Sequence, residues 1–597
     1  MTKNTRSPKK RSNSKIGPPA TSARVLAMEE GHVIKPHGGR LKVALAYPNS
    51  YQVGMSNLGY MKVYHLLNRR DDVVCERVFF PPPQEAAWIG DGRGHLCSLE
   101  SGLPLGKFDV IAFSITFEMD YSNALRMLSM AGVGGSSPLV MAGGIAVTMN
   151  PETMAERFHI MLIGEGEGII DPLVDAIIAK GPIPAGLAGL PGVYVTGGYE
   201  SSYGQDGRLA GVKPKPGYPG RVLRVWDKDA EGQPNLTRIF TPETVFGNMA
   251  LVETGKGCGR HCRFCAAGYS YRPTRVARRR ALMDLVDQAL KRNVRVGLVG
   301  SAVADHPDLM NILEHIVAKG GRFSISSMRL DMITGRFLEL CRDGGLKTIT
   351  VAPEAGSERM RRIVNKDLPR EKIIEAARLI GKTARFNLKL YFLVGLPWER
   401  DEDVEEIPRL VLDIRQAMVA ASSKRGTTGN ILVGVNGFIP KPWTPFQWAP
   451  FAGVKVIADK YKLVRARLRG APNVKLTTGS AIMDYIQAIL SMGDRRAGKL
   501  ARMAAEMEGD WSAALKKLTR DEDPGFDPVL LAPGGRAPGE ALPWEVVDYG
   551  MKEEYLEKDY EKAAIGQTVE NCPPPGHRCM RCGVFDGVCI DAPGRDE

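Results

Sequence analysis

The alternation of short apolar runs with amphipathic helical stretches constrains this chain of 597 residues most strongly, because the alternation occurs in two separate series. An apolar run bounded by turn residues and followed by a helical pattern is typical of a βα unit. Successive βα units build a parallel sheet with helices on its faces. The two series therefore predict an α/β protein. The length agrees, since domains contain roughly 100–200 residues each and one core cannot serve this chain.

The first series lies within residues 41–180. Its expected strands are LKVALAYP, FDVIAFSITF, PLVMAGG and HIMLIG, and its expected helices are GYMKVYHLLNRR, SNALRMLSMAG and EGIIDPLVDAIIAK. We predict a doubly wound parallel-sheet domain over residues 40–180. Ligands of such domains bind at the carboxyl ends of the strands, where Gly143, Gly144 and the loop 164–167 are expected.

The second series, within residues 246–440, contains six expected strands, NMALVE, VRVGLVG, RFSISS, KTITVA, LKLYFLVG and ILVGVNGF. Six βα units predict a (β/α)6-type partial barrel over residues 246–450, with chemistry at the C-terminal ends of its strands. Residues 181–245 are rich in Gly, Pro and Tyr, which predicts a hairpin-rich linker. We expect a mostly helical C-terminal region over residues 455–571 and a Cys-rich tail over residues 572–597 that binds metal or an Fe–S cluster.

The net charge of +13 is concentrated near the N-terminus, because residues 1–25 contain seven Lys or Arg residues and no acid. We predict that these residues form a disordered tail. Such a tail can contact RNA or an acidic surface, or it can serve only as a solubility extension. No apolar run approaches the roughly 18 residues of a membrane helix, and the N-terminus lacks the apolar segment of a secretory signal. We therefore expect a cytoplasmic protein without a membrane partner.

Three of the ten cysteines, Cys258, Cys262 and Cys265, fall in GKGCGRHCRFCAAGY, directly after an expected strand. Three thiolates suit a [4Fe–4S] cluster and leave its fourth iron without a protein ligand. The alternative is a zinc site that takes His261 as a fourth ligand, since structural zinc prefers closed tetrahedral coordination. Glycines around the cysteines allow the backbone to wrap tightly, and Phe264 places an aromatic ring beside the third cysteine.

Cys258, Cys262, Phe264 and Cys265 resemble the cluster-binding signature of the radical S-adenosylmethionine superfamily. The resemblance implies that the cysteines hold a [4Fe–4S] cluster and that Phe264 lies against the adenine of S-adenosylmethionine. It also implies that the open iron binds the amino and carboxylate groups of that cofactor. An electron from a donor such as flavodoxin or ferredoxin would then cleave the sulfonium to a 5′-deoxyadenosyl radical, the cofactors supplying the chemistry and the protein the orientation.

At two further barrel positions, the residues of this chain agree with the family's pattern to different degrees. The family binds the methionine amino group with a Gly-Gly-Glu segment after the second strand, but this chain has Gly300, Ser301 and Ala302 there, so the acid is missing and Ser301 occupies the position. Glu354, after the fourth strand, matches a glutamate that lies near S-adenosylmethionine in related enzymes. A solvated acid at the start of a helix is the alternative for Glu354.

Two other strand ends carry candidates for the same cofactor. Ser327 and Arg329 follow the third strand, and Arg329 is a candidate partner of the methionine carboxylate, with an ion pair at the rim of the core as the alternative. Gly395 follows the fifth strand and would let the backbone approach the adenine, or it forms an ordinary turn.

A more specific resemblance concerns a subgroup in which the radical domain follows a cobalamin-binding-like domain. It rests on FDVIAFSITFEMDYSNALRML, AGGIAVTMNPE, GEGEGIIDPL, FCAAGYSYRP, APEAGSERM and FIPKPWTPFQW. At the positions of the usual cobalamin signature, Asp-x-His-x-x-Gly, this chain has Asn49, Tyr51 and Gly54, so the Asp–His pair is missing. Whether cobalamin binds is therefore an open question. The alternative is a degenerate sheet domain that only caps the barrel.

The resemblance leaves the reaction after radical formation open. With cobalamin, it implies methyl transfer to an unactivated carbon. Without cobalamin, it implies hydrogen abstraction that leads to oxidation, rearrangement or sulfur insertion, with RNA or a peptide as candidate substrates. A non-catalytic Fe–S sensor is a further alternative, although it gives no reason for an iron without a protein ligand.

A second cysteine group, Cys572, Cys579, Cys582 and Cys589, supplies four thiolates near the C-terminus. Four thiolates predict either a second Fe–S cluster, which we favour, or a closed zinc site. A disordered tail with free thiols is the remaining alternative. Residues 272–280, RPTRVARRR, are a candidate phosphate-binding segment for RNA or a cofactor. A solvated helix face is the interpretation we prefer for this arginine run.

Overall fold

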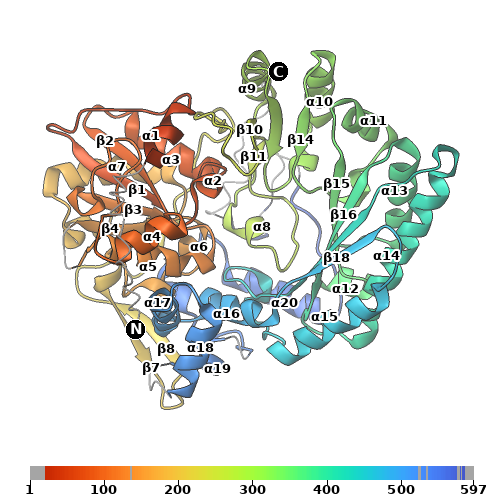
Figure 1. Ribbon diagram of the computed structural model, residues 1–597. Coiled ribbons are helices and arrows are strands. Elements are labelled where there is room, and N and C mark those ends of the chain that lie inside the picture. The colour runs from red at the N-terminus through yellow and green to blue at the C-terminus, as the bar shows by residue number, and fades with distance from the viewer. Residues whose placement is uncertain are drawn as a thin grey trace, which may run out of the picture.

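The computed structural model describes residues 20–134, 138–521, 526–532, 535–573, 579 and 581–584. The predicted α/β fold class is confirmed. Figure 1 shows the N-terminal sheet domain on one side and the partial barrel on the other, with α8 (Ala266–Ser270) between them. The C-terminal helices lie below both parts (Figure 1).

The N-terminal sheet has six strands in the order β2-β1-β3-β4-β5-β6. The four strands predicted in this region are present, and β2 and β6 were not predicted. All neighbours pair in parallel except β6, which is antiparallel to β5. The strands are β1 (Leu41–Tyr47), β2 (Val73–Phe79), β3 (Val110–Ser114), β4 (Leu139–Gly143), β5 (Ile160–Leu162) and β6 (Val193–Val195).

Helices cover both faces of this sheet. On one face, α3 (Leu58–Asn68) and α7 (Gly166–Lys180) share an apolar core with β1. On the other face, α5 (Tyr121–Met130) packs with helices from the C-terminal region, which therefore returns to the N-terminal domain. Those helices are α16 (Ala481–Met492), α17 (Gly498–Glu506) and α18 (Trp511–Arg520).

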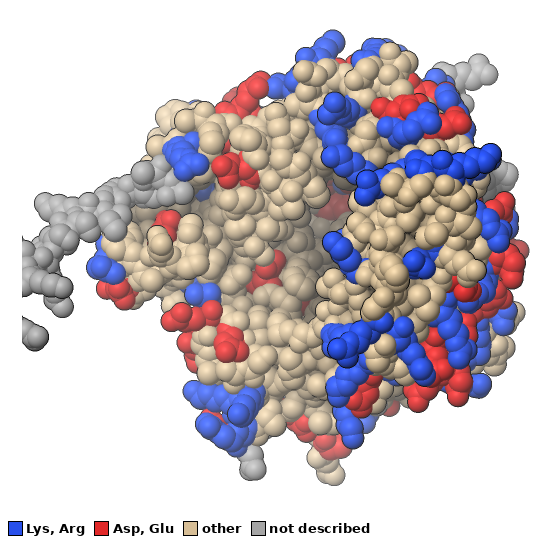
Figure 2. Space-filling model, turned by 45° about the vertical axis from the view of Figure 1, so that its right-hand side comes forward, with Lys and Arg blue, Asp and Glu red and all other residues tan. Residues whose placement is uncertain are grey.

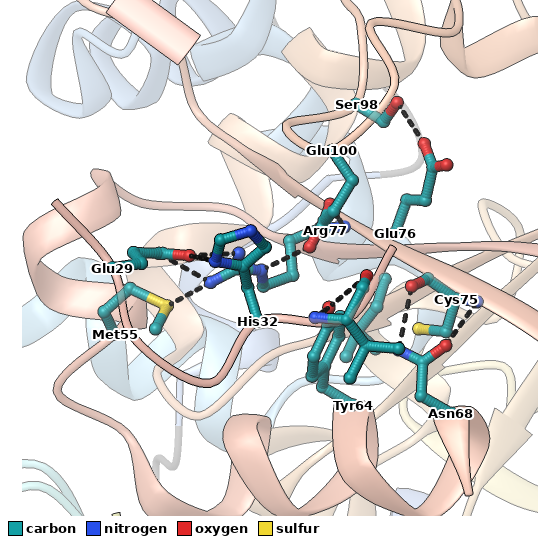
Figure 3. Close-up of polar contacts among 12 residues, drawn as sticks. Glu29, His32, Met55, Tyr64, Asn68, Cys75, Glu76, Arg77, Ser98 and Glu100 are labelled. Carbon is teal, nitrogen blue, oxygen red and sulfur yellow. Dashed lines mark hydrogen bonds and ion pairs between the residues drawn. The ribbon is translucent and has the colours of Figure 1, made fainter. Parts of the chain in front are cut away.

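A buried ion pair attaches the first described segment to this sheet (Figure 3). Arg77 of β2 is fully buried and pairs with Glu29 at 2.6 Å and with Glu100 at 2.7 Å. Glu29 closely follows α1 (Ala20–Ala27). The predicted disordered tail over 1–25 is therefore wrong for residues 20–25, which are helical, and residues 1–19 lie outside the described part of the chain.

The barrel has seven parallel strands, one more than predicted. Two sheets, β10-β13-β14 and β15-β16-β17-β18, are joined by a bridge between Met328 and Val351. The seventh strand, β18 (Val474–Thr478), interrupts the C-terminal region that we expected to be mostly helical. The other six are β10 (Met249–Glu253), β13 (Arg295–Val299), β14 (Phe323–Ile325), β15 (Thr348–Glu354), β16 (Asn387–Val394) and β17 (Ile431–Gly437).

Helices cover the outside of these strands and supply the apolar side chains of the barrel core. The longest is α14, and its Ile407, Val411 and Ile414 are buried, as its 3.6-residue periodicity predicts. The helices are α9 (Arg279–Lys291), α10 (Leu309–Ala318), α11 (Gly335–Asp343), α13 (Arg370–Thr383), α14 (Asp401–Ala421) and α15 (Val454–Leu468).

The segment between the two sheets contains the expected hairpin, formed by β7 (Tyr199–Tyr203) and β8 (Leu209–Pro214). Beyond it, β9 (Val222–Leu223) pairs with β19 (Val547–Asp548), and α20 (Glu553–Ala564) then packs near the 3-10 turn Pro445–Trp448 that follows β17. Among the described residues, no helix combines the length and the apolar character needed to cross a membrane.

Candidate active site between the two sheets

The three central cysteines lie on a loop closed at its base by a short ladder. We call residues 257–265 the cluster loop. It follows β10 and β11 (Gly255–Lys256), and β11 pairs antiparallel with β12 (Arg275–Val276). Gly257 has φ +78°, and a Cβ there would lie 2.5 Å from the carbonyl oxygen of Tyr271. Glycine is therefore required at this position, because the backbone conformation and the close approach both exclude a side chain.

Cys258, Cys262 and Cys265 lie close together in partial burial. Burial, with the neighbouring Cys262 thiol as a further cause, raises the pKa of Cys258 to about 11 and that of Cys265 to about 12. A metal would take these groups as thiolates and release their protons. A closed zinc site needs a fourth ligand, but both ring nitrogens of His261 are engaged elsewhere, Nδ1 by Arg272 and Nε2 by the sulfur of Cys572. The three thiols therefore fit a [4Fe–4S] cluster, which distributes three cysteines over separate irons.

Side chains between the cysteines hold the cluster loop in place. Arg260 pairs with Asp305, beyond β13, with 2.6 Å between Nη2 and Oδ1. Arg263 is fully buried and pairs with Asp559 of α20 at 2.8 Å. Arg263 also donates a hydrogen bond to the carbonyl oxygen of Ile363. The barrel and the C-terminal helix thus fix the loop from two sides.

Phe264, the predicted adenine contact, lies at the carboxyl ends of three barrel strands. It packs, partly buried, against an apolar group that includes Ala355, Leu396 and Phe438. These residues follow β15, β16 and β17 respectively. An aromatic ring among apolar side chains is a suitable surface for a flat heterocycle.

Charged side chains converge on Cys262. The charges of Lys366, Glu354 and Arg329 all act on this thiol, whose pKa is raised mainly by burial. Lys366 and Glu354 form an ion pair at 2.9 Å. Glu354 ends β15 at a register shift and has φ +69°, a conformation that costs energy for a residue with a side chain and is common at functional sites. The alternative of a solvated acid for Glu354 is therefore wrong.

The other predicted cofactor contacts differ in their surroundings. Arg329 pairs with Asp331 at 2.9 Å, so the ion pair considered as its alternative is present. Ser327 is exposed. Gly395 has φ +78°, and a Cβ there would lie 2.3 Å from Cδ1 of Ile457, so packing alone explains this glycine.

A cavity of about 380 Å³ lies between the N-terminal sheet and the barrel. The sheet contributes Ser114, Gly143 and Gly164 from its strand ends, and the barrel contributes Gly257 and Ser301. Figure 2 shows that the molecule is hollowed between its two halves and that most of this hollow is uncharged. The cavity therefore adjoins the cluster loop at the edge where a doubly wound sheet binds its ligands.

A network of ion pairs joins the two sides of this cavity. Lys256 pairs with Glu165 at 3.3 Å, with Glu167 at 2.7 Å and with Asp227 at 3.6 Å. The oxygens of these three acids lie within 4.8 Å of one another, a spacing that a cation could use. Lys256 already occupies that position, and Arg275 pairs with Glu165 at 2.8 Å. The group is therefore a clamp between the domains.

The arginine run at 272–280 is divided between the interior and the surface. Arg272 and Arg275 are buried, so the solvated-face interpretation is wrong for these two residues. Arg278, Arg279 and Arg280, at the start of α9, are exposed, as that interpretation predicts.

The positions of the missing cobalamin signature lie outside the inter-domain cavity. Asn49 donates a hydrogen bond to Asp120 at 2.9 Å, and Tyr51 donates one to Glu29. Both line a different cavity, of about 740 Å³, beside Phe80. Asn49 and Tyr51 are thus used by the fold, and no histidine is among the described residues that line the inter-domain cavity.

The C-terminal cysteine group contacts the cluster loop through Cys572. The backbone N–H of Cys572 donates to the carbonyl oxygen of Gly259 at 2.7 Å, and its sulfur lies 3.3 Å from Nε2 of His261. Cys579 and Cys582 are described as well, and Cys589 lies outside the described residues. The sequence placed the two cysteine groups more than 300 residues apart and gave no sign that they meet.

Sequence reasoning also missed Lys366, Asp305 and Asp559, which pair with side chains at the site. The available signal was the charge of the spacer residues Arg260 and Arg263, each of which needs a counter-charge when buried.

Comparison with known proteins identifies two families in the sequence. The family of N-terminal domains of radical SAM proteins matches residues 59–195, and the radical SAM superfamily matches residues 252–411. An uncharacterized protein, MJ0966, of Methanocaldococcus jannaschii is 28% identical over 460 residues, which cover 76% of this chain and 90% of that protein. A putative methylthiotransferase of the same organism, MJ0865, is 24% identical over 184 residues, 28% of this chain and 40% of that protein.

Solved structures resemble the fold more distantly. The cobalamin-dependent S-adenosylmethionine radical enzyme OxsB, with aqua-cobalamin bound, has a TM-score of 0.42 and 16% identity, over 62% of this chain and 52% of that chain. Streptococcus suis SuiB bound to S-adenosylmethionine has a TM-score of 0.28 and 12% identity, over 39% of this chain and 50% of that chain. The match thus spans about half the length of either solved protein.

Proposed function

Because this chain belongs to the radical S-adenosylmethionine superfamily, we propose that it reductively cleaves S-adenosylmethionine at a [4Fe–4S] cluster held by Cys258, Cys262 and Cys265. We further propose that the resulting radical acts on a substrate in the inter-domain cavity. The observation that carries this proposal is the set of three thiols on a closed loop, where charged side chains act on Cys262, Phe264 packs at the carboxyl ends of three barrel strands, and Gly257 lines the inter-domain cavity.

When bound, the cluster and S-adenosylmethionine supply the electron and the 5′-deoxyadenosyl radical. The protein's part is to bind and orient the cofactor. Glu354 offers a carboxylate to the ammonium group or the ribose hydroxyls, and Arg329 and Lys366 offer positive charge to the methionine carboxylate. Phe264 supplies the apolar contact for adenine. Ser301 lines the inter-domain cavity. Ser327 and Gly395 stay candidate contacts only because they follow the ends of barrel strands.

The cavity also has to keep water away from a reactive radical. Its walls are strand ends from both domains, and the Lys256 clamp closes them together beside the cluster loop. The clamp contains two cations, Lys256 and Arg275, and three acids, Glu165, Glu167 and Asp227, so most of its charge is neutralised within it.

Methyl transfer with cobalamin is the second candidate, and the cavity's place at the carboxyl ends of β1, β3, β4 and β5 favours it. The residues fit a corrinoid only in part. A volume of about 380 Å³ lies near the lower end of pockets for drug-sized ligands. It suits a small substrate or the nucleotide-like tail of a corrinoid better than the whole molecule. Gly144 and Gly164 are explained by contacts with the backbone of Ile115 and Val225, so they form no open cradle.

Visible spectra of anaerobic protein titrated with cobalamin decide this second candidate. A stoichiometric bound corrin supports methyl transfer. No binding at saturating cobalamin rejects it and leaves hydrogen abstraction or sulfur insertion on a small molecule, an RNA or a peptide.

Binding of S-adenosylmethionine to the cluster tests the main proposal. The protein, reconstituted anaerobically with iron and sulfide and reduced with dithionite, should change its electron paramagnetic resonance spectrum when S-adenosylmethionine is added. Cys262→Ala should lose this change. Cys97→Ala, at a thiol in the N-terminal domain, should keep it. An unchanged wild-type spectrum would show that no cofactor binds at the cluster.

A further inference from the structure

A buried cation beside the cluster loop lacks a carboxylate partner. Arg272 is 2% exposed. Its Nε donates to the carbonyl oxygen of Gly268 at 2.7 Å and its Nη2 to Nδ1 of His261 at 2.8 Å. Its Nη1 is buried without a hydrogen-bond partner among the described residues. The Arg272 guanidinium also lies over the rings of Tyr269 and Tyr555, at 4.5 Å and 5.8 Å from their centres, but neither neutral ring is an anion. A buried charge without an anionic partner costs several kcal/mol.

The groups whose charges act most strongly on Arg272 are phenols and thiols: Tyr555, Cys582, Tyr269 and Cys572. A thiol becomes an anion only when it is deprotonated, and metal coordination keeps a cysteine deprotonated. The unpaired Nη1 and the two nearby sulfurs therefore indicate metal-bound thiolates at this place.

Several contacts hold the C-terminal cysteines together near Arg272. Arg581 donates to the carbonyl oxygen of Asn571 at 2.7 Å and to the sulfur of Cys579 at 3.4 Å. The backbone N–H of Lys552 donates to the carbonyl oxygen of Cys582 at 3.0 Å. Residues 571 and 572 are thus held against residues 579 and 581, and Cys582 is held against the residue before α20.

His261 links this group to the cluster loop through a hydrogen bond of defined direction. Guanidinium groups only donate, so Nδ1 of His261 accepts from Arg272 and carries no proton. The proton of the imidazole is then on Nε2, which donates to the sulfur of Cys572 at 3.3 Å. His261 is therefore a hydrogen-bond donor to this thiolate and not a metal ligand.

We propose that Cys572, Cys579 and Cys582 hold a second iron–sulfur centre, that Arg272 is its counter-cation, and that His261 tunes it from the cluster loop. Hydrogen bonds to cluster sulfurs set reduction potentials, and a donor stabilises the more negative, reduced state. This centre deepens the proposed function, but it does not require that S-adenosylmethionine is cleaved.

Removing the first cluster tests whether the second exists. The triple variant C258A/C262A/C265A, reconstituted anaerobically at full length, should keep about half of the wild-type iron and sulfide, together with a cluster signal after reduction. Adding C572A/C579A/C582A should remove both. Stoichiometric zinc without sulfide, or complete loss of iron in the first variant, would overturn the proposal. If the first variant does not fold, Mössbauer spectra of the wild type decide, because two centres are expected and the iron of one cluster alone would contradict them.

A redox titration of the remaining cluster in C258A/C262A/C265A tests the role of His261. Adding His261→Phe removes the donor and should move the midpoint potential to a more negative value. His261→Gln keeps an N–H donor and should restore most of the shift. The control is His315→Phe, on α10, where the imidazole contacts Asp287 at 2.7 Å, and it should leave the potential unchanged. Equal potentials in all variants would overturn the assignment of His261.

Discussion

At the scale of single residues, backbone conformations that disfavour side chains lie next to the proposed cluster and cofactor. Gly257 directly precedes the first cysteine, and Glu354 adopts a positive φ although it carries a side chain. Both are held by neighbouring elements, Gly257 against Tyr271 and Glu354 by its ion pair with Lys366. Strain of this kind costs about 1–3 kcal/mol per residue and persists only where the surroundings enforce it.

Gly257→Ala should displace the cluster loop. Its Cβ would lie 2.5 Å from the Tyr271 carbonyl oxygen, at φ +78°. We expect a loss of stability of about 1–3 kcal/mol by denaturant unfolding and a lower iron content per chain after reconstitution. Gly335→Ala, at a helical position of α11 where a Cβ meets nothing within 4 Å, is the matched control. Equal iron contents in the two variants would show that the loop tolerates the side chain.

Asp120→Asn should stabilise the protein in a pH-dependent way. Burial raises the pKa of Asp120 to about 6 from a usual value of 3.8, with the charge of Glu118 as a lesser cause. The folded state therefore holds the proton more tightly, and the stability that it contributes is lost as the pH rises from about 4 through 6. The amide oxygen in D120N can still accept from Asn49.

Unfolding free energies at pH 4.5 and pH 7.5 measure this effect. The gain from D120N should be small at the lower pH and about 1–3 kcal/mol at the higher pH. Asp206→Asn, on the exposed β7–β8 hairpin, is the control. A gain that is the same at both pH values would contradict the titration of Asp120.

The spacing of Cys258, Cys262 and Cys265 was enough to predict a cluster loop and its aromatic neighbour, because local sequence determines local ligand geometry. Partners far away in sequence could not be predicted in the same way. Asp559 reaches Arg263 across 296 positions, and nothing in its own surroundings marks it as buried. The same limit hid the contact between His261 and Cys572.

At the scale of elements, α20 supports the cluster loop from below. Its Asp559 pairs with Arg263, and its Tyr555 contacts His261. Burial raises the pKa of Asp559, while Arg263 opposes that rise. Because both groups of the pair are almost fully buried, removing one would leave the other without a partner.

Arg263→Met should therefore destabilise the protein by about 3–5 kcal/mol, since it leaves Asp559 buried and unpaired. The double variant R263M/D559L removes both charges and should recover much of that loss. Chemical denaturation of the wild type, both single variants and the double variant measures the coupling. Additive losses in the double variant would show that the two side chains stabilise the fold independently.

The longer strands with apolar character were predicted correctly, whereas the mixed strands β2 and β18 and the three-residue strand β6 were missed. β2 contains Glu76 and Arg77, which are buried with polar partners: Ser98 and Ser101 donate to Glu76, and Glu29 and Glu100 pair with Arg77. β18 has the sequence VKLTT and is half-buried at the edge of its sheet. Its apolar pattern was too short to predict a strand. Such strands depend on pairing with neighbours distant in sequence, which local patterns do not reveal.

At the scale of the whole molecule, two connections hold the halves around the cavity. The C-terminal helices pack on the N-terminal sheet, and the side chain of Asn150 donates to the carbonyl oxygens of Ser491 and Gly493. The clamp around Lys256 closes the opposite side. A substrate would therefore meet walls from both domains.

Glu165→Ala should open this clamp. It leaves the buried Arg275 and Lys256 without their shared carboxylate, at an expected cost of about 3–5 kcal/mol. Hydrogen exchange measured by mass spectrometry should rise at the start of α7 and in the cluster loop. The control is Glu375→Gln, at an exposed position on α13. Unchanged exchange in the cluster loop would show that the two halves are held together without the clamp.

The formation of 5′-deoxyadenosine tests the central claim most directly. Reconstituted wild-type protein, given dithionite and S-adenosylmethionine under anaerobic conditions, should form 5′-deoxyadenosine and methionine in equal amounts. Cys262→Ala should form neither above background, and Cys579→Ala should retain the first cluster. A wild-type protein that holds a full [4Fe–4S] cluster and still leaves S-adenosylmethionine intact would contradict the account.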